Sequence, residues 1–127
     1  MATESFEKPG VKITIPDITP TLATAQYKAI AADGTLAATA GTGGVGILQN
    51  APAVGQNAEV MVEGITKAKA GSTPVVAGNL VTNETVTGYL IPAVSGDYVI
   101  GMALTSADTA GDIFALLLLP GSGGQLN

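Results

Sequence analysis

Short runs in which apolar and polar residues alternate recur along the chain, and turn-forming residues separate them every 8–12 positions. No segment sustains the 3.6-residue period of an amphipathic helix. The runs that predict strands are Val11–Ile15, Val45–Leu48, Ala58–Val62, Ile65–Ala68, Val75–Val76, Tyr89–Ile91, Tyr98–Leu104 and Ile113–Leu119. The pattern predicts an all-β barrel or sandwich, with room for one short helix in the Ala-rich stretches.

Two stretches of the chain are approximate copies of each other. Residues 45–64 and 100–121 each contain a β-type run, a turn of small and polar residues with a Gly, and a second apolar run closed by Gly. The offset between the copies grows from 55 to 57 residues, so the second copy carries small insertions. We expect two strand–turn–strand units in the core of one compact β domain.

Two further hairpins are indicated by their turn residues. Residues 26–40 contain an Asp-Gly pair at 33–34, which is a strong hairpin signal between β-compatible segments. Residues 80–88 form a second candidate hairpin that turns around 83–84.

The N-terminal segment reads as an extended arm punctuated by prolines. Within it Val11, Ile13 and Ile15 alternate with polar residues, which predicts a short strand with one apolar face. A lone strand is unstable, so it must pair with a sheet edge, either in its own domain or in another molecule. We expect these three residues to bind a partner. The expected division is an arm at 1–22, a β domain at 23–121 and a flexible tail at 122–127.

The composition removes most catalytic chemistry. The 127 residues suffice for one domain, and they include no Cys, His or Arg. This excludes thiolate chemistry, the usual general base and the bidentate phosphate clamp. A net charge of −5 would repel nucleic acid. We therefore expect no enzyme activity, no metal and no cofactor.

The apolar and charged content favours a protein that packs against neighbours. Apolar residues make up 46% and charged residues 12%, well below the usual quarter. The longest unbroken apolar run, Ile113–Leu119, is far shorter than the roughly 20 residues of a membrane helix, so we expect no membrane partner. A low-charge surface suits a subunit of an assembly, although a weakly charged free domain has the same composition.

Two patterns that are typical of active sites have simpler explanations. Gly41–Gly46 matches the string G-x-G-x-x-G, but strand residues follow it where a dinucleotide site needs a helix. Glu59 and Glu63 share one face of a predicted strand, yet they would lie roughly 13 Å apart, too far for a glycosidase pair. We expect a glycine-rich turn and a solvated strand face.

Two further pairs of charged residues also have simpler explanations than a binding or modification site. Asp108 and Asp112 lie in the turn of the second copy, but no dense set of oxygen ligands surrounds them in the sequence. Lys67 and Lys69 alternate with alanines as strand residues do, whereas a carrier domain presents its modified lysine at a hairpin tip. We expect neither a calcium site nor a lipoyl or biotinyl lysine.

The order of the elements between Tyr27 and Leu119 follows a family pattern. The segments that carry it are the hairpin at 26–40, VGIL at 45–48, the turn with Gly55, EVMVEG at 59–64, KAKAG at 67–71, AGNLV at 77–81, VIGMAL at 99–104 and AGD at 110–112. In this order the chain resembles the small decoration, or cement, proteins of tailed-phage capsids, the lambda-type head-decoration class. Asn79 departs from the pattern, because similar proteins often carry Asp after the Gly.

The resemblance implies a β-tulip domain, usually a homotrimer, at three-fold or quasi-three-fold positions on the outer surface of an expanded capsid. It implies the major capsid protein as partner, with the arm adding a strand to it and stabilising the head. The protein would then belong to the virion after assembly in the host cytoplasm. Two other classes remain open: a structural subunit of a tail or fibre, and a small carrier or enzyme domain.

Overall fold

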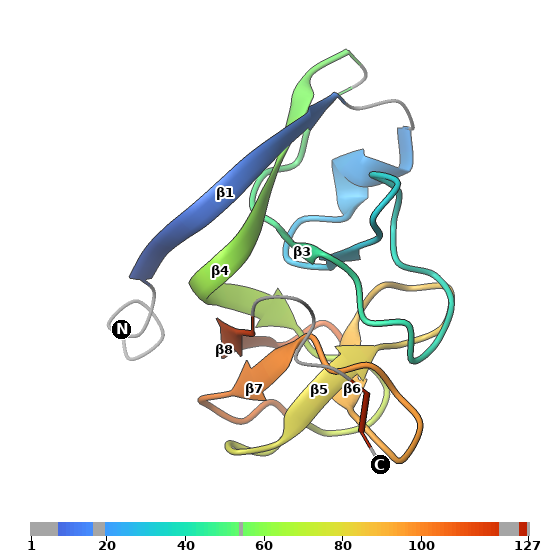
Figure 1. Cartoon of the computed structure of the whole chain (residues 1–127), viewed down its shortest axis with the longest axis vertical. Coiled ribbons are helices and arrows are strands. Elements are labelled where there is room, and N and C mark those ends of the chain that lie inside the picture. Colours follow the sequence, from blue (N-terminus) through green and yellow to red (C-terminus); the bar gives the residue numbers. More distant parts are fainter. Residues whose placement is uncertain (1–7, 17–19, 54, 120–124, 127) are drawn as a thin grey trace.

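The structure, a computed structural model, describes residues 8–16, 20–53, 55–119 and 125–126, and it is an all-β fold (Figure 1). Its elements are β1 (Lys8–Pro16), η1 (Pro20–Thr24), β2 (Ala29–Ile30), β3 (Gly46–Leu48), β4 (Asn57–Lys69), β5 (Leu80–Asn83), β6 (Leu90–Pro92), β7 (Gly101–Ala103) and β8 (Ile113–Leu118). The helical turn η1 is of the 3-10 type and is the only helical element in the described ranges. The predicted all-β class is confirmed.

Strands β2 to β8 form a barrel-like sheet that is nearly closed. They pair in the order β2–β3–β4–β8–β7–β5–β6, and each pairing is antiparallel. The two ends of this order meet, because the N–H of Ala29 in β2 donates to the carbonyl of Gly88, just before β6, at 2.9 Å. Closure of this kind removes most unpaired strand edges. Strand β1 lies outside this order and pairs with β4.

The two sequence copies form two equivalent hairpins, β3–β4 and β7–β8. Ile47 lies opposite Met61 in the first hairpin, and Met102 lies opposite Leu117 in the second. These pairs coincide when the copies are aligned with offsets of 55 and 56 residues. The predicted strand–turn–strand repeat is therefore present in the fold.

Each of these hairpins has a glycine at the point where its two strands approach most closely. A Cβ atom at Gly46 would meet the carbonyl oxygen of Met61, and one at Gly101 would meet that of Leu117. The partner backbone occupies the space of a side chain in both places, so only glycine fits.

Strand β4 changes its faces at a bend near Gly64. This residue has a φ of 119°, which residues with a Cβ rarely adopt, and the pairing with β1 is irregular in the same region. Before the bend, the even-numbered Ala58 and Val60 face a small cluster of buried side chains. After it, the even-numbered Ala68 and Ala70 face a larger one. Met61, before the bend, also belongs to the larger cluster, so β4 contributes to both cores and the bend changes which of its side chains face the larger one.

The larger cluster fills the barrel around Phe114 and Leu116, and the smaller one lies between η1, β3 and β4. The smaller cluster contains Leu22, Leu48 and Val60, all with no exposed surface. Burying each such side chain contributes about 1.5–3 kcal/mol. Leu22 falls inside the expected arm at 1–22, but its side chain packs in the body.

One kind of turn is used four times. The turns begin at Ala53, Val76, Val94 and Thr109, have Gly55, Gly78, Gly96 and Gly111 as their third residue, and end at Gln56, Asn79, Asp97 and Asp112. In each turn the last N–H donates to the first carbonyl, and the last side chain accepts the first N–H at 2.9–3.2 Å. The glycines have φ of 88–96°, as a type II turn requires at that position. Strands β4, β5 and β8 each begin directly after such a turn.

The predicted hairpin at 26–40 forms with very short strands. Its turn is tight, with Gly34 at a φ of 87° and its N–H donating to the carbonyl of Ala31 at 3.0 Å. Beyond the turn a single bridge joins Ile30 to Leu36. The chain then continues toward β3. The side chain of Asn83 holds this segment in place, because its amide donates to the carbonyls of residues 37 and 39 and accepts the N–H of residue 43.

Other strand boundaries differ from the expected ones. The predicted strands at 58–62 and 65–68 are one continuous strand, β4, because Gly64 bends the strand without breaking its pairing. Val75 makes only an isolated bridge, to Ala107. Within the expected tail, Gln125 bridges to Tyr98 and the N–H of Leu126 donates to Asp97, so these two residues are paired with the body.

Candidate partner-binding edge

The arm strand β1 pairs with β4 of its own chain. Val11, Ile13 and Ile15 lie opposite Glu63, Val60 and Ala58 respectively. Among the three, the side chain of Ile13 is described, and it is 40% exposed although it lies opposite a fully buried valine. The side chains of Val11 and Ile15 are outside the described part of the chain. Of the two pairings that the sequence left open, the structure contains the one within the home domain.

The other edge of β1 faces outward. Strands β1 and β3 both pair with Val60 and Met61, so they flank β4 on its two edges. In the described ranges β1 pairs only with β4, and Figure 1 shows it at the outer margin of the fold. An edge strand presents unpaired N–H and C=O groups that can bind a further strand. Prolines at both ends, Pro9 and Pro16, limit how far such pairing can extend.

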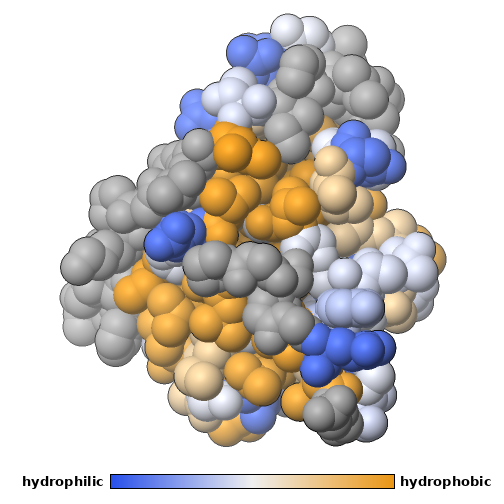
Figure 2. All heavy atoms as spheres, in the orientation of Figure 1, coloured by the Kyte–Doolittle hydropathy of each residue, from blue (hydrophilic) through white to orange (hydrophobic). Residues whose placement is uncertain are grey.

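A row of apolar side chains crosses the outside of the barrel. Ile65 on β4, Leu117 on β8, Met102 on β7 and Leu80 on β5 lie opposite one another in turn, and each is partly exposed. Figure 2 shows extensive apolar surface on the face seen in Figure 1, over the region of these strands. One end of the row is Ile65, which lies opposite Lys8, the first residue of β1. In the sequence, the run at 113–119 indicated an outward-facing apolar surface, because it is apolar on both faces of the predicted strand.

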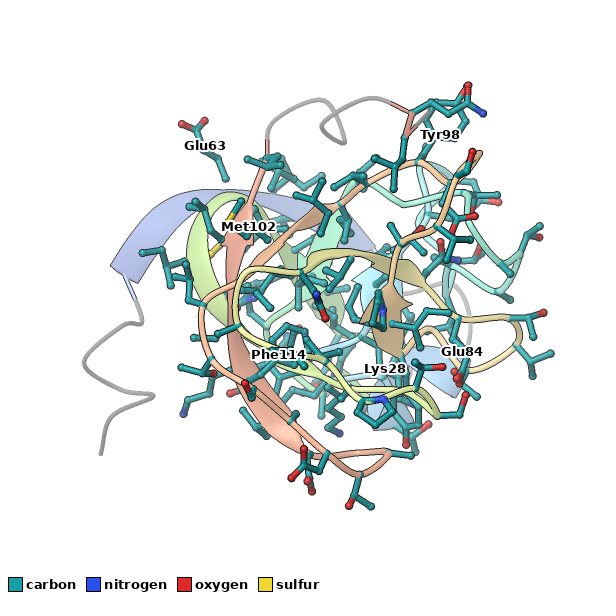
Figure 3. All side chains as sticks on the ribbon, turned by 90° about the horizontal axis from the view of Figure 1, so that it is seen from below. Lys28, Glu63, Glu84, Tyr98, Met102 and Phe114 are labelled. Atoms are coloured by element: carbon teal, nitrogen blue, oxygen red, sulfur yellow. The ribbon has the colours of Figure 1, made fainter. Side chains whose placement is uncertain are left out.

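Two clusters of polar groups lie on the side of the barrel opposite Glu63 (Figure 3). The carboxylate of Glu84 accepts the N–H and hydroxyl of Ser72 and the hydroxyl of Thr87. These hydrogen bonds, that from the Ser72 hydroxyl above all, lower the pKa of Glu84 although burial acts against them. The result is a clasp between the segment after β4 and the β5–β6 turn.

The second cluster is built around Lys28. Its ammonium nitrogen lies 4.7 Å from the centre of the Tyr89 ring, within the range of a cation–π contact. Burial, and then the charge of Lys69, lower the pKa of Lys28.

The residues that the sequence offered as alternative catalytic, carrier or nucleotide sites lie on strands or lead into one. Glu59 and Glu63 are both exposed on β4. Lys67 and Lys69 lie within β4 and not at a hairpin tip. The glycine-rich string at 41–46 leads into β3, a strand and not a helix.

The part of the chain that is described contains no cluster of side chains that could hold a metal ion. Asp108 and Asp112 are exposed, and no three Asp or Glu side chains there gather to hold a cation. A groove of about 280 Å³ is lined by Ala31, Ala32, Thr42, Gly44 and Val45. It is shallow, and its volume lies just below the roughly 300–1,000 Å³ of typical ligand sites.

The chain matches no protein-family model and no curated protein. In the described residues no helix is long and apolar enough to cross a membrane.

Proposed function

We propose that the protein is a capsid decoration protein that stabilises the outer surface of an expanded phage head, with the outer edge of β1 binding a strand of the major capsid protein. The observation that carries this proposal is the position of β1. It lies on the rim of a nearly closed barrel, held by one edge on β4, and no other described strand pairs with its second edge. A closed body with one such strand is suited to β-augmentation.

The surface of the body supports packing in an assembly. Charged residues make up only 12% of the chain, and the row from Ile65 to Leu80 leaves apolar atoms partly exposed on four neighbouring strands. Apolar surface of this kind is typical of interaction sites. If three copies associate, three β1 edges bind together, and the later contacts are effectively intramolecular.

The experiment is incubation with expanded, undecorated capsids followed by cryo-EM. We expect density at three-fold or quasi-three-fold positions, with a strand of the capsid protein beside β1. Absence of binding at saturating protein would contradict the proposal, and self-assembly into rods or tubes in negative stain would favour a tail or fibre subunit instead.

Two proline variants locate the edge that binds. Successive N–H groups of a strand point to opposite edges, so Ile13→Pro and Thr14→Pro each remove the donor of a different edge. We expect one variant to lose capsid binding while its melting temperature stays near that of the wild type, and the other to loosen β1 from β4. Full decoration by both variants would refute the role of β1.

A further inference from the structure

Among the described residues, the contacts that hold β1 to the body are those of one strand edge, its pairing with β4. In the described ranges β1 pairs with β4 and with no other strand. Its two described side chains, Ile13 and Thr14, are exposed, and neither belongs to a buried cluster. Release of β1 would therefore leave the contacts of both clusters among the described side chains in place.

The connection between β1 and the body is three residues long and has a proline on each side. Residues 17–19 join Pro16 to Pro20, the first residue of η1. Each proline fixes its own φ and biases the residue before it toward an extended conformation. Short hinge loops under strain favour exchange of an element between copies, because opening the hinge relieves the strain.

The edge of β4 that β1 covers must remain covered. It is paired from Asn57 to Ile65, and without β1 it would expose a long row of unpaired backbone groups. A second copy of the chain carries the identical strand and can restore the same register. Because the contacts are the same within one chain and between two, the connection and the protein concentration decide which form is populated.

We propose that β1 is an exchangeable strand, and that on assembly β1 of one copy pairs with β4 of a second copy in the register seen here. The outer edge of β1 stays open in the exchanged form. The exchange needs no capsid and concerns the free protein, so it can be tested apart from decoration.

A cysteine pair reports which chain supplies the strand. The wild-type protein has no cysteine. Thr14 and Glu59 are exposed and lie directly opposite each other in β1 and β4, within the Cα spacing that a disulfide accepts. The doubly substituted chain, Thr14→Cys with Glu59→Cys, is oxidised at high and at low protein concentration and run on a denaturing gel without reductant. We expect disulfide-linked copies as the main product at high concentration and single closed chains at low concentration.

A matched pair in the barrel serves as the control. Lys69 and Ile113 lie opposite each other in β4 and β8, and neither is buried. Cysteines at these two positions should close within one chain under the same conditions. Closure of both pairs within one chain at high concentration would overturn the exchange. So would a Thr14–Glu59 pair that does not close, and so would linked copies from both pairs, which would report association without exchange.

The hinge supplies a second, independent measurement. Insertion of flexible Gly-Ser residues after Asp17 lengthens the connection without touching β1 or β4. Since a relaxed connection removes the advantage of exchange, the product of the Thr14–Glu59 cysteine pair should move from linked copies to single chains. An unchanged proportion of linked copies would overturn the role given to the hinge.

Discussion

Hairpins β3–β4 and β7–β8 are built from two copies of one sequence unit, yet only the first carries an extra strand. They share their register, their close-approach glycine and their Gly-centred turn. They differ in the length of the second strand, because β4 has 13 residues and β8 has 6. The part of β4 before Gly64 extends beyond the stretch that pairs with β8, and β1 lies along it. One unit therefore lies wholly within the barrel sheet, while its copy also extends beyond it and pairs with β1.

The largest expected effect is in the copy that lies wholly within the barrel sheet. Leu116 is fully buried against the inner cluster, so Leu116→Asp places an unpaired carboxylate in an apolar core. This costs several kcal/mol, comparable with the whole stability of a small domain, about 5–15 kcal/mol. We expect no cooperative thermal transition in circular dichroism.

Its neighbour is the matched control for this prediction. Leu117 lies on the outer face and is partly exposed, so Leu117→Asp should fold with a much smaller loss of melting temperature. Equal losses for the two variants would contradict the assignment of inner and outer faces on β8.

The next effect tests whether the two hairpins are energetically as well as geometrically equivalent. Ala at either Gly46 or Gly101 forces its Cβ against a partner carbonyl, and the strands must separate. Overpacking of this kind costs about 1–3 kcal/mol or more. We expect Gly46→Ala and Gly101→Ala to lower the free energy of unfolding by similar amounts in urea titrations.

Gly55→Ala is the control for this prediction. A Cβ at Gly55 would meet nothing within 4 Å, so this change should lower the free energy of unfolding less, and only through the positive φ of the position. A large effect in only one hairpin would break the equivalence.

The fold class and the repeat were predictable because they rest on local signals. Alternation in the copies and the small residues of their turns mark strands and turns directly. The continuity of β4 was not predictable, since Gly64 reads as the end of a strand and the pairing that carries the strand through the bend comes from β8, far along the chain. The four related turns carry a weak signal, a Gly followed by Gln, Asn or Asp, which identifies them only when their hydrogen bonds are seen together.

The candidate site was predictable in part. Alternation at Val11, Ile13 and Ile15 predicts a strand, and β1 is one. Its choice of partner could not be read from the sequence, because any free edge satisfies the same backbone groups. The apolar row consists of one residue from each of four strands: Ile65, Leu117, Met102 and Leu80. It could not be predicted from the sequence, because only the pairing register places these residues side by side.

A smaller effect is expected from removing the strand that makes the copies unequal. Deletion of residues 1–16 removes β1 and leaves both described clusters intact, so the shortened chain should still unfold cooperatively with a lower melting temperature. Deletion of residues 1–24 also removes Leu22, which is fully buried, and should cost about 2–5 kcal/mol more. Loss of folding in the shorter deletion would show that β1 is integral to the body.

The smallest effect lies outside both copies, at the clasp between Ser72 and Glu84. Hydrogen bonds from Ser72, and one from Thr87, lower the pKa of Glu84 in the folded state from its ordinary value of 4.5. A carboxyl whose pKa is lowered by folding stabilises the fold above its unfolded pKa, and this contribution is lost as pH falls through the lowered folded value. Glu84→Gln lacks the charge at every pH. We therefore expect the wild type to be slightly more stable than this variant at neutral pH, and the difference to shrink as pH falls below about 4.5. Asp33→Asn is the matched comparison. Hydrogen bonds from Thr35, two residues away, also lower the pKa of Asp33, but this carboxylate is fully exposed, so we expect a smaller pH-dependent difference in stability than for Glu84→Gln. A difference between wild type and Glu84→Gln that does not change with pH would show that the clasp acts through packing and not through charge.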